Sequence, residues 1–174
     1  VVGEVQGENL SFGDTVQTAT GQISLTPDNQ PAAPYMVLAS LVTNGAIEIT
    51  GYSEEYISQP SELKIASSLG GALAGSLTQG VSGTILITSG GQLTADTLSN
   101  SGTITLANNN YNEISQGAGA AGHLMVTNAY TENGVLVSQT SNDGVVIADD
   151  PNEVSVGSMV LTGEIKVIDD LLFS

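Results

Sequence analysis

The sequence predicts an all-β domain built as an antiparallel β-sandwich or jelly roll, and three observations predict it. Apolar residues recur at the second and fourth positions after a glycine, as in residues 45–49 and 83–87, which is the pattern of a strand with one buried face. Short glycine-containing turns, such as residues 89–91 and 141–144, separate these segments as they do in hairpins. A hydrophobic fraction of 40% over 174 residues is enough for a single domain, residues 1–174, with its own core.

A β-helix or solenoid is the alternative fold. The leading glycines Gly83, Gly102, Gly122, Gly144 and Gly163 follow one another at intervals of 19, 20, 22 and 19 residues. A spacing of about 20 residues is typical of solenoid rungs, and it also arises when each hairpin in a series is counted once. The hairpin-like turns favour the antiparallel arrangement.

The expected strands follow one another along most of the chain, and two segments interrupt them. Residues 27–34 contain three prolines, so we expect a loop or an extended crossover there. Residues 61–79 predict one short helix, which Ser61 caps. Its apolar positions step by three or four residues, and they are Leu63, Ala66, Leu69, Leu73 and Leu77. The three glycines within this segment weaken the helix by roughly 1 kcal/mol each relative to alanine.

The stretch 83–110, which reads GTILITSGGQLTADTLSNSGTITLANNN, resembles the repeats of secreted haemagglutinin-type adhesins. Those repeats form β-helices. The resemblance implies an extracellular, β-rich surface protein without catalytic residues. It covers about a sixth of the chain and transfers no functional residue.

The charge balance excludes several partners. The chain carries 2 lysines and no arginine against 18 acidic residues, which gives a formal net charge of −16. Nucleic acids and anionic membrane surfaces are bound mainly through lysine and arginine, so we expect neither as a partner. No apolar run reaches the roughly 18 residues of a membrane span, so we expect no membrane insertion. The start at Val1-Val2 is typical of a processed chain and favours an extracellular, cell-surface or virion location.

Catalytic chemistry has little support in the sequence, and we expect no enzyme activity. His123 is the single histidine, there is no cysteine, and no G-x-S-x-G motif surrounds a serine nucleophile. Adjacent carboxylates such as Glu54-Glu55 and Asp169-Asp170 point to opposite faces if they lie in strands. We therefore expect His123 to be an exposed or hydrogen-bonded loop residue.

Calcium is the one cofactor that the residue pattern suggests. Calcium takes oxygen ligands from carboxylates, amides and backbone carbonyls in loops. The acidic turn that includes Asp149, Asp150, Asn152 and Glu153 offers such ligands, although its spacing is not that of an EF-hand. A solvated acidic turn is the alternative interpretation.

These observations together predict a non-enzymatic structural subunit that assembles with copies of itself into an extracellular filament, a pilus-like fibre, or a surface or virion layer. Residues 1–12 form an acceptable strand, which either pairs in its own sheet or is exchanged between subunits by strand addition. The residues expected to contribute to such an assembly are Val1, Val2, Val5, Leu10 and Phe12. The alternative function is a monomeric extracellular adhesion or ligand-binding module that contacts a host or cell-surface ligand.

Overall fold

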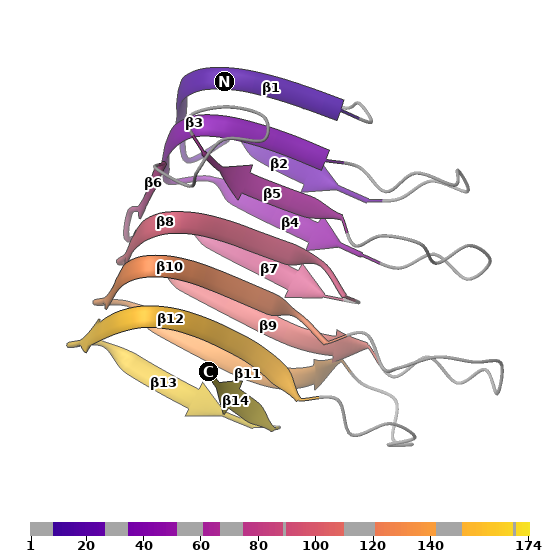
Figure 1. Cartoon of the computed structure of the whole chain (residues 1–174), viewed down its shortest axis with the longest axis vertical. Helices are drawn as coiled ribbons and strands as arrows, with labels where there is room; N and C mark the ends of the chain where they lie inside the picture. The colour runs from indigo at the N-terminus through magenta and orange to yellow at the C-terminus, as the bar shows by residue number, and fades with distance from the viewer. Residues whose placement is uncertain are drawn as a thin grey trace, which may run out of the picture.

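The computed structural model describes residues 9–26, 35–51, 61–66, 75–88, 90–109, 121–141, 151–168 and 170–174. These residues form two β-sheets in which every strand pair is parallel. The chain passes from one sheet to the other and back, so that successive turns of a solenoid stack on one another (Figure 1).

The first sheet has the strand order β1-β3-β5-β8-β10-β12-β14, and β6 pairs with both β3 and β8. Its strands are β1 (Asn9–Gln17), β3 (Tyr35–Thr43), β5 (Glu62–Ile65), β6 (Ser76–Gln79), β8 (Gln92–Asn100), β10 (His123–Glu132), β12 (Asn152–Leu161) and β14 (Leu171–Phe173). The second sheet has the order β13-β11-β9-β7-β4-β2. Its strands are β2 (Gln22–Leu25), β4 (Ala46–Thr50), β7 (Thr84–Thr88), β9 (Thr103–Asn109), β11 (Val135–Ser141) and β13 (Glu164–Val167).

The core lies between the two sheets and consists of aliphatic columns that run along the stack. In the second sheet, Ile23, Ile47, Ile85, Ile104 and Leu136 follow one another in register and are almost completely buried. The period-2 pattern of the sequence produces this arrangement, because alternate side chains of each strand point inward. Each rung buries its apolar face only against its neighbours, as in other repeat architectures.

A column of glycines forms the corner that leads into the second sheet. A Cβ atom at Gly102 would lie 2.3 Å from the carbonyl oxygen of Gly83, and one at Gly134 would lie 2.1 Å from that of Gly102. The same carbonyl oxygens accept ladder hydrogen bonds, at 3.1 Å from the Thr103 amide and 2.9 Å from the Val135 amide. Glycine is needed here because the rungs approach too closely for any side chain.

Polar side chains are stacked inside this corner. Gln17, Thr43, Gln79, Asn100 and Glu132 occupy successive rungs in register and are at most 1% exposed. They hydrogen-bond to one another and to the backbone of the corner: Thr43 donates to Gln17 at 2.8 Å, and Asn100 donates to the Glu132 carboxylate at 2.8 and 2.9 Å. These bonds offset the cost of burying polar groups, and among the described residues the Gln79 side-chain oxygen is the buried atom left without a hydrogen bond.

Glu132 is the acidic member of this corner column. Its carboxylate accepts hydrogen bonds from the Asn100 amide, from the Gly134 backbone N–H at 2.7 Å and from the Tyr130 hydroxyl. Burial, the charge of Glu132 and the hydrogen bond to Glu132 hold the pKa of Tyr130 well above its ordinary value. Tyr130 therefore remains a neutral donor to this carboxylate.

The predicted antiparallel sandwich or jelly roll is wrong, because the sheets are parallel. The turn at residues 89–91 does not close a hairpin: β7 before it and β8 after it lie in different sheets. The same holds for β8 and β9 on either side of Ser101 and Gly102. Glycine turns serve both hairpins and solenoid corners, so the local turn chemistry did not distinguish them. The parallel pairing is that of the alternative, the solenoid.

The regular spacing near 20 residues was nevertheless misleading, because it combined glycines from different columns. The corner glycines Gly83 and Gly102 are 19 residues apart, but Gly102 and Gly134 are 32 apart. Gly122 lies at the opposite corner, just before β10, where its carbonyl oxygen accepts a hydrogen bond from the Glu153 amide near the start of β12. Rung length therefore varies with the connections between strands.

The predicted helix at residues 61–79 is also wrong where the structure describes this segment. Residues 62–65 form β5 and residues 76–79 form β6, and residues 67–74 lie outside the described part. Leu63 and Leu77, which the helical pattern placed on one face, are buried core residues of these two strands. Pairing with β3 and β8 on either side satisfies the backbone groups, and this tertiary pairing outweighs a helical spacing that glycines already weaken.

Candidate functional site

Of the four predicted calcium ligands, the structure describes Asn152 and Glu153, and these two side chains do not converge. Asp149 and Asp150 lie outside that part, so calcium binding by them stays a prediction. Asn152 and Glu153 begin β12 and point to opposite faces, as neighbours in a strand do.

Asn152 is buried and its amide group is used within the core. Its side-chain oxygen accepts the Gly122 amide at 3.0 Å, and its nitrogen donates to Ser138 Oγ at 2.9 Å and to the Leu106 carbonyl at 3.2 Å. These contacts join the two sheets at the corner where β12 begins. Asn152 is therefore a structural anchor.

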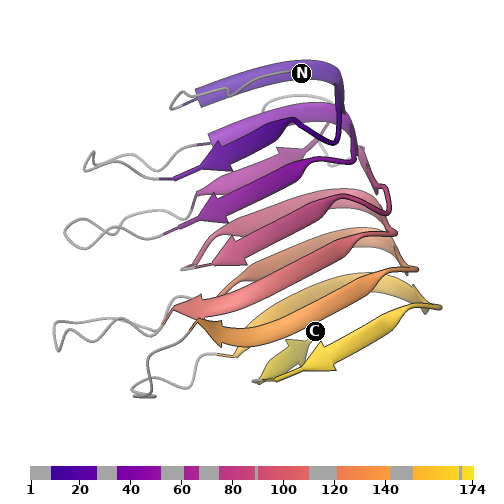
Figure 2. The same cartoon turned by 180° about the vertical axis from the view of Figure 1, so that it is seen from behind.

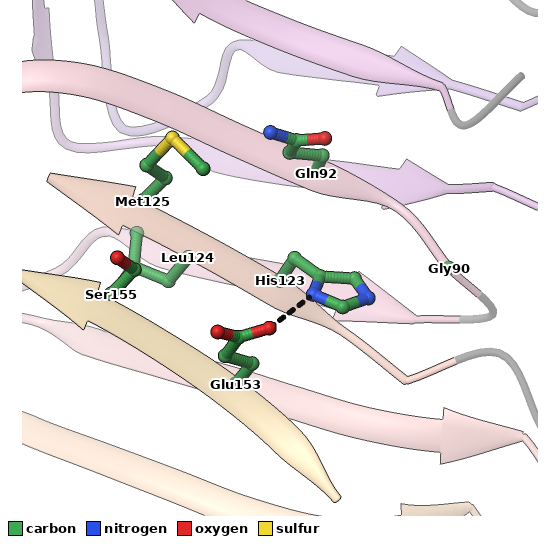
Figure 3. A pocket seen from close by; sticks show the side chains of 7 residues that line it. All are labelled: Gly90, Gln92, His123, Leu124, Met125, Glu153 and Ser155. Atoms are coloured by element: carbon green, nitrogen blue, oxygen red, sulfur yellow. Dashed lines mark ion pairs between the residues drawn. The ribbon is translucent and has the colours of Figure 1, made fainter. Parts of the chain in front are cut away.

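The side chain of Glu153 points outward and lies beside that of His123, the single histidine of the chain. His123 is the first residue of β10, a strand residue where the sequence suggested a loop, and lies opposite Gln92 of β8 and Glu153 of β12. His123 Nδ1 is 3.4 Å from a carboxylate oxygen of Glu153, and both side chains are partly exposed (Figure 3). Glu153 also accepts a hydrogen bond from Ser174 at 2.9 Å.

A hollow of about 240 Å³ opens over these strands. It is lined by Gly90, Gln92, His123, Leu124, Met125, Glu153 and Ser155 (Figure 3). The connection between β7 and β8 that borders it is short, residues 89–91, and Gly90 adopts a φ of 77° and has no side chain to fill the space. The result is a small site with an exposed thioether beside amide, imidazole, carboxylate and hydroxyl groups.

The sequence identifies His123 and Glu153 as separate candidates and gives no sign that their side chains are in contact. The two residues are 30 positions apart, and only the parallel register of β10 and β12 makes them neighbours. Within the described ranges, no group of three or more histidine and acidic side chains is arranged to hold a metal ion. Lys166, one of the two lysines of the chain, is half-exposed and lies 3.4 Å from Glu164 of its own strand.

The two ends of the solenoid form the second notable surface. Phe12 is paired with Leu38, and Phe173 is paired with Val154, and both partners are buried core residues. Phe12 and Phe173 occupy the same core-facing positions but are 43% and 44% exposed. Leu161 pairs with the buried Glu132 and is 49% exposed. In Figures 1 and 2 the strands that carry them lie at the two extremes of the stack. Core positions of the terminal rungs are thus open to solvent.

Among the strands that the structure describes, the outermost strands at these ends have a neighbouring strand on one side only. The first sheet begins with β1 and the second with β2, and β13 is the last strand of the second sheet. Unpaired edges present rows of backbone donors and acceptors that favour the addition of another strand.

The predicted assembly residues fall partly within this region. Leu10 and Phe12 belong to β1, where they pair with Met36 and Leu38 of the same chain, and Leu10 packs against the core. Val1, Val2 and Val5 lie outside the described residues. From residue 9 onward, the N-terminal segment pairs in its own sheet, and exchange between subunits stays a prediction.

Comparison of this chain with protein-family models, with curated proteins and with solved structures found no match. In the segments that the structure describes, no helix has the length and apolar character needed to cross a membrane.

Proposed function

We propose that the chain is a non-enzymatic structural subunit of an extracellular filament or surface layer, in which copies associate through the ends of the solenoid. The observation that carries this proposal is the exposure of core-facing side chains at both ends, on strands that are the outermost of their sheets in the described part of the chain. A second copy covers both features at once, because its end rung supplies apolar contacts and backbone partners.

The interior of the molecule supports a structural role. Aliphatic columns, the glycine corner and the buried polar column are continuous from rung to rung. Repeats of this kind gain stability from each interface between neighbours, so an additional rung extends the same pattern. A stack of parallel rungs is a stiff spacer, which is what a filament or surface layer requires.

Net charge opposes this association. Each copy carries −16, so copies repel one another unless their carboxylates are screened or protonated. We expect assembly to strengthen with added salt and on lowering the pH from 7 towards 4. Assembly that does not respond to either condition would contradict this electrostatic account.

The test compares the chain with a variant at its C-terminal end. Sedimentation velocity and negative-stain electron microscopy are expected to show elongated oligomers of the unmodified chain at high salt. Phe173→Glu places a charge on the open end and is expected to reduce them. Val81→Glu is the matched control, because Val81 is 83% exposed on a turn within the stack. A chain that stays monomeric under all these conditions refutes the proposal.

The hollow beside His123 favours a second candidate function, a monomeric extracellular adhesion or ligand-binding module. Its mixture of apolar and hydrogen-bonding groups is that of a small-ligand site. A persistent monomer that binds a ligand in this hollow would support this second function over the first.

A further inference from the structure

We propose that the hollow over β8, β10 and β12 binds an alkylammonium or guanidinium group through Glu153, and that His123 is an internal competitor for the same carboxylate. This inference concerns the side of the solenoid and does not depend on association at its ends.

The parallel register places the necessary groups in one row. Glu62, Gln92, His123 and Glu153 are direct neighbours on β5, β8, β10 and β12. Side chains at paired positions of adjacent strands stand on the same face about 5 Å apart. A cation that reaches Glu153 therefore also meets the polar side chains of the row, and exposed Met125 contacts the apolar stem of the ligand.

Charge selects a cation over an anion. The lining residues include one carboxylate and neither of the two lysines. Glu62 adds a second carboxylate one strand beyond Gln92, where it accepts a hydrogen bond from Thr94 at 2.9 Å. Lys64 of β5 is the cationic group nearest in register, opposite Thr94. With a total charge of −16, the surrounding field also attracts cations.

His123 makes the site sensitive to pH. Its Nδ1 lies 3.4 Å from Glu153, so a protonated imidazole neutralises the carboxylate from within the row. Histidine side chains change charge between about pH 5 and 8. When the imidazole is neutral, Glu153 is available to an external cation. We therefore expect binding to strengthen as the pH rises.

The experiment uses the full chain labelled with ¹³C at the methionine methyl groups. Met125 lines the hollow, whereas Met36 is buried in the core and serves as an internal reference. One titration uses spermidine, a free polyamine, and another uses a capped Ala-Ala-Arg-Ala-Ala peptide, which presents a protein side chain. The same peptide with neutral citrulline in place of arginine is the ligand control.

At pH 8 we expect a saturable shift of the Met125 resonance with a cationic ligand and none with the citrulline peptide. Removing the carboxylate in Glu153→Gln is expected to weaken binding about fivefold, the size of one exposed ion pair. Glu164→Gln, which removes an exposed carboxylate that pairs with Lys166 on the other sheet, is the matched control and should leave binding unchanged. Lowering the pH to 5 should also weaken binding about fivefold, and His123→Gln should abolish most of this difference.

Binding of the peptide alone assigns the site to a basic side chain of a protein partner, and binding of spermidine alone assigns it to free amines. Either result supports the proposal. An unmoved Met125 resonance at pH 8, an equal response to citrulline, or an equal loss in Glu153→Gln and Glu164→Gln overturns it. A pH dependence that persists unchanged in His123→Gln overturns the role of His123.

Discussion

The glycine corner allows a quantitative test of the solenoid itself, through the substitution Gly102→Ala. The new Cβ would lie 2.3 Å from the Gly83 carbonyl oxygen, 2.7 Å from that of Gly80 and 2.8 Å from the side-chain nitrogen of Gln79. Two of these three atoms belong to the backbone, so they cannot rotate away. The rungs must separate locally to accommodate one methyl group.

The loss of stability in Gly102→Ala has two contributions, a lost hydrogen bond and overpacking of the corner. The Gly83 carbonyl accepts the Thr103 amide at 3.1 Å, and a displaced ladder loses that hydrogen bond, which contributes about 1 kcal/mol. Overpacking of a tightly packed interior adds about 1–3 kcal/mol. We expect Gly102→Ala to lower the free energy of unfolding by about 3 kcal/mol in total. For a domain of this size that corresponds to a fall in Tm of about 6–12 °C.

Thermal and urea unfolding followed by far-ultraviolet circular dichroism measures this change. Gly13→Ala is the matched control, because a Cβ at Gly13 meets no atom within 4 Å. It should leave stability unchanged or raise it by about 0.5 kcal/mol, since alanine loses less conformational entropy on folding. If Gly102→Ala and Gly13→Ala unfold together, the close stacking of the corner is refuted.

Three further predictions concern the buried polar groups. The pKa of Tyr130 is raised in the folded chain, so its contribution to stability is complete below the ordinary tyrosine range and falls as the pH rises above about 10. In urea unfolding from pH 8 to 11, the free energy of unfolding should decline less steeply in Tyr130→Phe than in the unmodified chain. Glu132→Leu removes the acceptor of three neighbouring donors and should destabilise the chain by about 2–4 kcal/mol in chemical denaturation at pH 7. Asn152→Ala leaves the Gly122 amide without its buried acceptor and should cost about 2 kcal/mol, whereas Ser155→Ala on the outer face should cost less than about 0.5 kcal/mol in the same assay.

The sequence alone determined the all-β class and the buried face of many strands, but not β5 and β6, for which it predicted a helix. Alternation at Ile47 and Ile49, and again at Ile85 and Ile87, correctly identified the buried face of each strand, because a period of two is a local property of the chain. The charge of −16 and the scarcity of cationic side chains are likewise independent of the fold.

The tertiary structure decided how those strands pair and which residues meet. A turn such as Gly90-Gly91 permits a hairpin or a corner equally well, and the choice depends on stacking against rungs far away in sequence, where Gly102 meets Gly83 and Gly134 meets Gly102. The same long-range register brings His123 to Glu153 and leaves the core open at Phe12 and Phe173. The period of the hydrophobic pattern specifies which face of a strand is buried. The partner strand is specified by the pairing energy summed over neighbouring strands, and no local pattern identifies those neighbours.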